Sequence, residues 1–287
     1  MHVPVLKKEV LEYLNPEANE NFIDCTVGEA GHAKEILEKI KPNGKVLGID
    51  ADLKIIEKIG QEERLILVCD NYSNLKNIAE KHDFHPISGI LIDLGMSSWH
   101  VTDSKKGFSF LKDEPLDMRY GSNNLTAEMI VNEYSKVELE NILKNYGEER
   151  FAERIAENIS QRRKLKPIKT TFQLIEIINQ SIPLKFQRGK INPATRVFQA
   201  IRIAVNDELN NIKKALPTAV EILAQGGRLA VISFHSLEDR IIKNFFKDQN
   251  SAGKIKILTK KPITPGQEEI KSNPRSRSAK LRVVEKI

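Results

Sequence analysis

A glycine-containing turn with acidic residues lies near the start of the 287-residue chain. The segment DCTVGEAGH follows an apolar run and contains Gly28 and Gly31. Glycine at a strand-to-helix turn permits a positive φ and a close approach of a ligand to the backbone. Asp50 follows about twenty residues later, where a carboxylate can accept hydrogen bonds from both hydroxyls of a ribose. The spacing predicts the nucleotide-binding half of a Rossmann-type unit.

The charge of this turn indicates the class of cofactor. Asp24 and Glu29 flank Gly28, and they would repel the pyrophosphate that a dinucleotide brings to such a turn. The third glycine of the dinucleotide fingerprint is also missing. S-adenosylmethionine has no phosphate and carries sulfonium and ammonium cations, which carboxylates attract. The turn therefore favours methyl transfer over a nicotinamide-dependent oxidoreduction.

Acidic residues recur where predicted strands end. Three such strands end at Asp24, Asp50 and Asp93, and a fourth ends next to Asp70. In a doubly wound sheet these ends line one crevice. Tyr72 follows the third strand, where its ring could pack on an adenine. We expect one acidic crevice that holds the methyl donor.

The residues after the fourth strand could serve the reaction itself. Enzymes that methylate exocyclic base amines commonly carry Asp/Asn-Pro-Pro-aromatic at this place, whereas this chain has DLGMSS from Asp93 to Ser98. The lone pair of such an amine is delocalised into the ring, and an acceptor on the N–H can direct it at the sulfonium methyl. Asp93 could be that acceptor or could hold the cofactor. The sequence leaves both roles open.

Further candidate residues lie at the same predicted edge. After the fifth strand, Phe234 and His235 place an aromatic ring and an imidazole there. His235 could hydrogen-bond the base or relay a proton, although a lone histidine is more often structural. Trp99, Phe108 and Phe110 are candidate stacking surfaces for an extruded base, or core residues.

Well over one hundred residues separate Asp93 from the fifth buried strand, Arg228–Phe234. They show helical periodicity over 127–134, 136–146, 148–163, 171–180 and 193–224, the last with an expected break at Pro217. The chain is therefore predicted to be α/β, a Rossmann-like doubly wound sheet with an inserted all-helical domain. The expected parts are 1–104, the first part of the core; 105–205, the substrate-recognition insert; and 206–287, the second part with a basic C-terminal segment.

The formal net charge of +6 is distributed in clusters. They are Arg162–Lys164 with Lys166, Lys185 with Arg188 and Lys190, Lys260–Lys261, and finally Arg275, Arg277, Lys280 and Arg282, mostly in stretches that read as loops. Any one cluster could be a solvated surface, but together they suit a polyanion and predict a nucleic-acid partner.

Other features narrow the class of protein. No apolar run is long enough to span a bilayer, and the N-terminus lacks a signal-peptide core. Cys25 and Cys69 are isolated thiols, as in a reducing compartment, and the six histidines lack metal-ligand spacing. We expect a cytoplasmic protein without a metal or a membrane partner.

Several long blocks carry a family resemblance. They are DCTVGEAGH, GILIDLGMSS, KGFSF with EPLDMR, YGEERFAERIA, RVFQAIRIAVNDEL, GGRLAVISFHSLEDRI and NPRSRSAKLR. The chain resembles the RsmH family, also called MraW, nearly from end to end. This resemblance implies a class I fold, S-adenosylmethionine as donor, and N4 of a cytosine in the decoding region (P site) of 16S ribosomal RNA as acceptor, within the small ribosomal subunit.

The resemblance also assigns residues. Cofactor contacts fall on Ala30, Gly31, His32, Asp50, Tyr72 and Asp93. Where the family has Ser-Ser-Pro-Gln, this chain has Ser97-Ser98-Trp99-His100, so the glutamine contact passes to His100 or is lost. Ala30 replaces the first glycine of a Gly-Gly-His turn, which alanine fits if its φ is negative. Our predicted catalytic residues are Asp93 and His235, and the predicted substrate contacts are Ser97, Ser98, Phe234, Arg275, Arg277 and Arg282.

Other classes of function remain open. A methyltransferase acting on protein or on a small metabolite would share the cofactor crevice without needing the basic clusters. A nicotinamide-dependent oxidoreductase would have to bind a dinucleotide. A non-catalytic RNA-binding protein would keep the fold and the RNA affinity but transfer nothing. Methyl transfer to RNA, measured directly, separates these readings.

Overall fold

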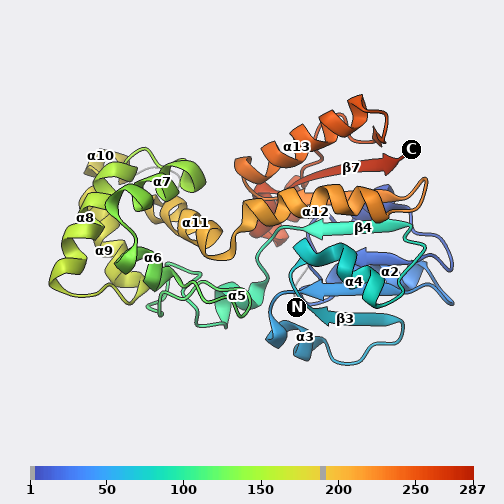
Figure 1. Cartoon of the computed structure of the whole chain (residues 1–287), viewed down its shortest axis with the longest axis horizontal. Helices are drawn as coiled ribbons and strands as arrows, with labels where there is room; N and C mark the ends of the chain where they lie inside the picture. The colour runs from blue at the N-terminus through green and yellow to red at the C-terminus, as the bar shows by residue number, and fades with distance from the viewer. Residues whose placement is uncertain (1–3, 188–191) are drawn as a thin grey trace. The chain divides into compact units, whose positions relative to one another are not determined.

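The computed structural model describes residues 4–187 and 192–287 (Figure 1). The chain divides into two compact units, the first formed by Met1–Gly95 with Leu209–Ile287 and the second by Met96–Glu208. The expected insert, 105–205, lies within the second unit. That unit begins earlier because Met96 packs against its apolar core.

In the described part of the chain, the first unit contains a seven-stranded sheet in the order β3-β2-β1-β4-β5-β7-β6. The strands are β1 (Phe22–Asp24), β2 (Val46–Asp50), β3 (Leu65–Cys69), β4 (Gly89–Asp93), β5 (Arg228–Ser233), β6 (Ile255–Ile257) and β7 (Lys280–Lys286). Strands β1 to β5 pair in parallel, and their order reverses at β1, which opens a crevice at the carboxyl ends of β1 and β4. The predicted Rossmann-like α/β fold is confirmed.

The last strand corrects the sequence interpretation. We expected a loop-like basic segment at Lys280 and Arg282, but β7 pairs antiparallel with β5 and β6. Leu281 and Val283 are fully buried, because alternate side chains of a strand point to the same face. The charged Arg282 between them makes this alternation hard to recognise in the sequence.

Helices cover both faces of the sheet. Ile23 and Ile49 face α4 (Leu75–Lys81), α12 (Glu208–Ile222) and α13 (Ser236–Ser251). On the other face, Phe22 and Val46 pack against α1 (Lys7–Leu14) and α2 (Gly31–Lys39). Alternation along each strand thus builds two apolar layers and leaves the strand ends for polar side chains. The remaining short elements are α3 (Leu53–Ile59), η1 (Tyr72–Asn74), α14 (Gln267–Ser272) and η2 (Pro274–Ser278).

The second unit is helical, as Figure 1 shows. Its helices are α5 (Ser98–Thr102), α6 (Ala127–Glu133), α7 (Lys136–Gly147), α8 (Ala152–Leu165), α9 (Thr171–Ser181), α10 (Leu184–Gln187) and α11 (Pro193–Asn206). Ile130, Leu143, Ile155, Leu174 and Ile201 are almost completely buried and share one core. The expected helices are present within a few residues of their predicted bounds.

The helix break is not at Pro217, where the sequence predicted it. Pro217 lies inside α12, and the chain breaks at Asp207, whose φ is 50°. Asn206 ends α11 because its side chain is held by a loop: it donates to the Met118 carbonyl (2.7 Å) and accepts the Tyr120 N–H (2.9 Å). This anchor is a long-range contact and leaves no local sign in the sequence.

Among the residues that the structure describes, no helix combines the length and the apolar character needed to cross a bilayer.

Candidate active site

The turn between β1 and α2 is fastened to the end of β2. Gly28 has a φ of 51°, and its N–H donates to Oδ2 of Asp50 (3.1 Å). Oδ1 of Asp50 accepts the Asp52 N–H (2.9 Å). The Asp50 carboxylate is therefore oriented by backbone donors of two loops, and each of its oxygens has a second lone pair for hydrogen bonding.

Ala30 differs from the expectation. Its φ is 61°, in the left-handed region, so the condition of a negative φ is not met. The Ala30 N–H donates to the Val27 carbonyl (2.7 Å), and Ala30 then precedes the first residue of α2. The conformation costs an alanine about 1 to 2 kcal/mol, which burial of its methyl group in the core offsets in part. At Gly31 packing requires a glycine, because a Cβ atom would lie 2.5 Å from Cγ of Pro4.

The structure brings together Asp24, Asp50 and Asp93. Burial raises the pKa of Asp24 to about 7, the charges of Asp93 and Asp50 add to it, and the Thr26 N–H opposes it. Burial and the charge of Glu238 likewise raise the pKa of Asp93 to about 7, against a hydrogen bond from the Gly95 N–H (3.1 Å). A cation at this rim would favour the ionised carboxylates.

Asp70, the other predicted carboxylate, is used within its own turn. Its Oδ1 accepts the Asn71 N–H (2.6 Å) and the Asn74 side-chain amide (2.8 Å). Tyr72 begins η1 two residues later and packs, half-buried, against the core of the first unit.

His32 and Thr26 both lie close to Asp93. Nε2 of His32, on the first turn of α2, is 3.8 Å from Oδ2 of Asp93. The Thr26 hydroxyl accepts the Asp93 N–H (2.7 Å) and ties the loop after β1 to the end of β4. Sequence reasoning missed Thr26, although it stands inside the DCTVGEAGH turn and is a hydrogen-bonding residue there.

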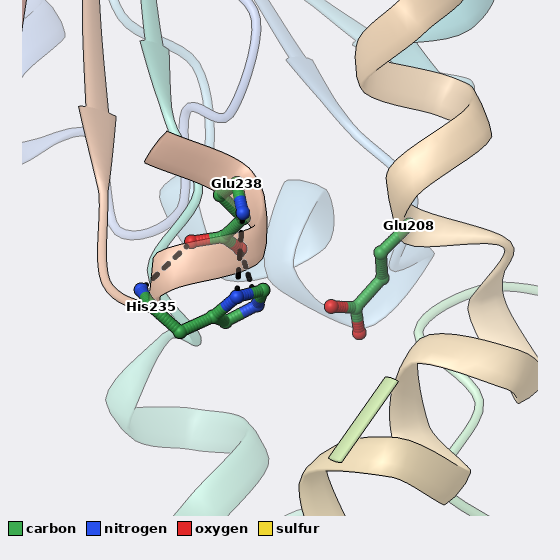
Figure 2. A group of neighbouring side chains, drawn as sticks. All are labelled: Glu208, His235 and Glu238. Atoms are coloured by element: carbon green, nitrogen blue, oxygen red, sulfur yellow. Dashed lines mark hydrogen bonds and ion pairs between the residues drawn. The ribbon is translucent and has the colours of Figure 1, made fainter. Parts of the chain in front are cut away.

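His235 caps α13 (Figure 2). Its Nδ1 accepts the Glu238 N–H (3.4 Å), and its Nε2 lies 3.1 Å from Oε1 of Glu238. Oε2 of Glu238 accepts the N–H groups of Phe234 (2.8 Å) and His235 (3.2 Å). This geometry favours a capping role for His235 over the proton relay that the sequence suggested. Glu208, also drawn, belongs to the second unit, where Arg202 donates to both of its oxygens.

Phe234 lies against Gly95. Gly95 was not among the site residues predicted from the sequence. A Cβ atom on Gly95 would be 2.9 Å from the Phe234 ring and 3.1 Å from Oδ1 of Asp93. A side chain at this position would collide with the ring, so glycine permits this close approach. The ring of Phe234 and the carboxylate of Asp93 thus both lie against Gly95.

Ser97, Ser98 and His100 lie in the second unit, at α5. The Ser97 hydroxyl is 2.9 Å from Nδ1 of His100. His100 is 4% exposed, and its ring packs on Phe108 (5.1 Å between centroids) and Tyr120 (4.8 Å). Such burial argues against His100 as a replacement for the family's glutamine contact.

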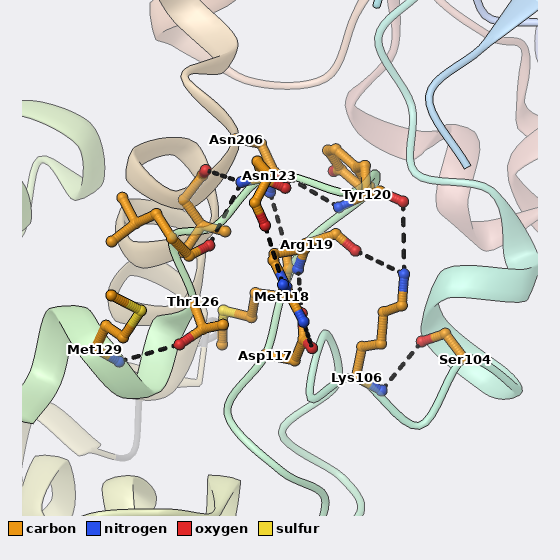
Figure 3. Close-up of polar contacts among 12 residues, drawn as sticks. Ser104, Lys106, Asp117, Met118, Arg119, Tyr120, Asn123, Thr126, Met129 and Asn206 are labelled. Carbon is orange, nitrogen blue, oxygen red and sulfur yellow. Dashed lines mark hydrogen bonds and ion pairs between the residues drawn. The ribbon is translucent and has the colours of Figure 1, made fainter. Parts of the chain in front are cut away.

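Polar contacts fix the loop that follows α5 (Figure 3). Lys106 donates to the Arg119 carbonyl (3.0 Å), and Arg119 pairs with Asp117 (2.8 Å). The Asn123 amide donates to the Val205 carbonyl of α11 (2.7 Å). The loop is thus held rigidly against α11.

Of the predicted stacking residues, Phe108 is buried and Phe110 packs half-buried on Phe198 (5.7 Å between centroids). Trp99 is half-buried. The first two belong to the core of the second unit, which was the alternative interpretation.

The predicted RNA contacts separate into two kinds. Arg275 and Arg277 are exposed on η2. Arg282 instead pairs with Asp239 across the β7–α13 layer (2.7 Å), with its side chain 11% exposed. Although burial opposes it, hydrogen bonds from Arg282 and Lys280 lower the pKa of Asp239. Arg188 and Lys190 lie outside the described residues.

These residues fit a cationic nucleoside. Asp50 offers an oriented acceptor at the place of a ribose, and the carboxyl groups at the rim suit positive charge instead of phosphate.

Known proteins resemble this chain over its whole length. The model of the MraW methylase family matches residues 1–287. Ribosomal RNA small subunit methyltransferase H of Halothermothrix orenii is 46% identical over 306 residues, covering 100% of this chain and 98% of that protein. The protein of the same name from Clostridium botulinum is also 46% identical, with 100% and 99% covered. A solved rRNA methylase from Streptococcus thermophilus gives a TM-score of 0.44 at 13% identity, over 98% of this chain and 93% of that one.

The chain therefore belongs to the MraW methylase family and is a methyltransferase that depends on S-adenosylmethionine.

Proposed function

We propose that this enzyme methylates N4 of a cytosine in the decoding region of 16S ribosomal RNA, within the small subunit. The names of its relatives support the ribosomal RNA of the small subunit as substrate. The observation that carries the chemistry is Asp93, a largely buried carboxyl group with a pKa raised to about 7, which lies with the Phe234 ring against Gly95.

The residues of the first unit divide the work of holding the cofactor. Asp50 accepts hydrogen bonds from the ribose hydroxyls, and Tyr72 packs against the adenine. Ala30, Gly31 and His32 form the adjoining turn, while Asp24 and Asp93 attract the positive charge. When bound, S-adenosylmethionine supplies an electrophilic methyl group and departs as a neutral thioether.

Asp93 acts on the acceptor amine. Its carboxylate accepts a hydrogen bond from the N4–H, so that the nitrogen lone pair is available to form the new N–C bond. The N–H bond then breaks, and Asp93 holds the released proton. A pKa of about 7 suits this role, because the group is ionised in a large fraction of molecules at neutral pH and is still a competent base.

Other residues position the base. Phe234, whose ring packs at Gly95 beside Asp93, offers that ring to the cytosine. His32, 3.8 Å from Asp93, orients that carboxylate. Ser97 and Ser98 remain predicted substrate contacts, and Arg275 and Arg277 bind phosphates of the RNA. An enzyme with this substrate works in the cytoplasm, where ribosomal subunits are assembled.

The test is a transfer assay with labelled S-adenosylmethionine and three acceptors: small subunits from a strain lacking the modification, naked 16S RNA and bulk protein. Nucleoside analysis should show N4-methylcytidine from one position. Label in protein or in another nucleoside would refute the proposal, and no label with any acceptor would favour a non-catalytic RNA-binding protein.

A further inference from the structure

An exposed aromatic ring lies on the short helix α10 of the second unit. Phe186 is 39% exposed, and its ring packs against Phe151 with 5.3 Å between centroids. Phe151 directly precedes α8, so the two rings join segments about 35 residues apart in sequence (186 against 151). Figure 1 shows α10 beside α8.

Two cations lie close to the exposed ring. The guanidinium carbon of Arg150 lies 4.9 Å from the Phe186 centroid and 5.7 Å from that of Phe151. Nζ of Lys185 lies 5.1 Å from the Phe186 centroid. Arg150, Phe151, Lys185 and Phe186 together form what we call the basic aromatic surface. Its cations lie within cation–π distance of the rings.

Hydrogen bonds hold this surface in place. The Phe186 N–H donates to the Pro183 carbonyl (2.8 Å), and the Gln187 side chain donates to the Ile182 carbonyl (2.6 Å). On the other side, the Phe151 N–H donates to the buried carboxylate of Glu149 (2.8 Å). Both rings are thus presented on anchored backbone.

We propose that the basic aromatic surface binds a single-stranded segment of the ribosomal RNA, with one base stacked on Phe186 and phosphates at Arg150 and Lys185. Exposed aromatic rings between cations bind single-stranded nucleic acid, because bases stack on the ring and phosphates pair with the charges. An acidic peptide would match the charges but would not need the exposed ring. The inference rests on the proposed function, which supplies the RNA.

Substitutions at Phe186 test the stacking. The probe is a fluorescein-labelled single-stranded oligoribonucleotide. A second oligomer of the same length and label, but without bases, serves as the comparison. Phe186→Ala in the full chain should weaken binding of the first about ten-fold to a hundred-fold and leave binding of the abasic oligomer unchanged. Phe186→Trp should restore the affinity, whereas Phe186→Leu should not.

Phe172 provides the matched control. It is also exposed, at 48%, but its N–H donates to Asp113, so a carboxylate lies beside it. Phe172→Ala should bind the oligomer like the wild type. An equal loss in both alanine variants, or an equal loss for the abasic oligomer, would overturn the stacking proposal.

Arg150→Ala and Lys185→Ala test the phosphate contacts. Each should lower the slope of log K against log salt by about 0.7, the value for one contact to a single strand. Unchanged slopes, or weaker binding to intact subunits with full affinity for naked RNA, would reject an RNA surface in favour of a protein partner.

The outcomes also distinguish this inference from the proposed function. If wild-type enzyme methylates the cytosine but Phe186→Ala binds RNA normally, only the basic aromatic surface is refuted. If wild-type enzyme methylates no RNA, the proposed function fails whatever the Phe186 variants bind.

Discussion

Nε2 of His32 lies 3.8 Å from Oδ2 of Asp93, so the first turn of α2 faces the carboxyl end of β4. This pair joins the cofactor turn to the residue that we assign to the acceptor amine. The effect of a substitution at Asp93 therefore has to be measured both on cofactor affinity and on the rate of methyl transfer.

Asp93→Asn should lower kcat about a hundred-fold or more, because an amide is too weak a base to take the N4 proton. In the wild type, kcat should rise with pH through about pH 7, as Asp93 ionises, and the variant should lose this rise. Calorimetry should find a smaller loss of cofactor affinity than of kcat, because Asp24 still attracts the positive charge of the cofactor. A normal kcat with lost affinity would instead assign Asp93 to holding the cofactor.

Asp50→Ala should weaken cofactor binding at least about ten-fold, since two charge-assisted hydrogen bonds to the ribose are lost. Asp70→Ala is the matched control, because its carboxylate also follows a strand but accepts hydrogen bonds within its own turn. Calorimetric titration with S-adenosylmethionine measures both. Equal affinities in the two variants would contradict the ribose assignment.

Asp24 should make stability depend on pH. Its pKa is raised from 3.8 to about 7 in the folded protein, so the protonated form favours folding. Its contribution is fully present below about pH 4 and is lost as the pH rises through about 7, at up to about 1.4 kcal/mol per pH unit. Asp24→Asn lacks this loss, and its Tm should rise relative to wild type between pH 4 and pH 7. Asp248→Asn, on an exposed position of α13, controls for removal of one charge. A constant Tm difference over this range would count against the burial of a titrating Asp24.

Gly95→Ala should reduce methyl transfer while sparing cofactor binding, because the new methyl group collides with the Phe234 ring. Phe234→Leu in the same chain should relieve the collision without restoring the stacked base. Gly266→Ala is a suitable control, since a Cβ atom there meets nothing within 4 Å. Full activity of Gly95→Ala in a transfer assay would show that the close packing of Phe234 on Gly95 does not matter for the substrate.

Substitutions of the arginines near the C-terminus should have two different effects, one on RNA binding and one on stability. Arg275→Ala with Arg277→Ala should flatten the salt dependence of RNA binding at unchanged Tm. Arg282→Ala should lower stability by about 1 to 3 kcal/mol, because Asp239 loses one of its two hydrogen-bonded cations and keeps Lys280. Urea unfolding and binding titrations at several salt concentrations distinguish the two. If Arg282→Ala is fully stable but loses RNA affinity, Arg282 is a substrate contact, as the sequence predicted.

The sequence predicts well those features that depend on local pattern. The apolar strands ending at Asp24, Asp50 and Asp93 and the helices of the second unit follow from periodicity and from turn residues. Local pattern also placed Gly28 at a turn that needs a positive φ.

Features that depend on distant partners could not be predicted. Lys280–Lys286 forms a strand because it pairs with β5. Helix α11 ends where the loop at Met118 holds Asn206. Arg282 is buried because it pairs with Asp239. The left-handed backbone of Ala30 has no local sign in the sequence, because alanine ordinarily takes a negative φ. The need for glycine at position 95 is visible only once Phe234 is placed beside it.

Strand β7 also has a consequence for biosynthesis. It covers the edge of β5 and is made by residues 280–286, downstream of every other strand. While the nascent chain is still emerging, β5 therefore exposes an unpaired apolar edge of the kind that invites aggregation. A ribosome stalled before codon 280 should display a protein bound by chaperones, and release of the last strand should end that binding.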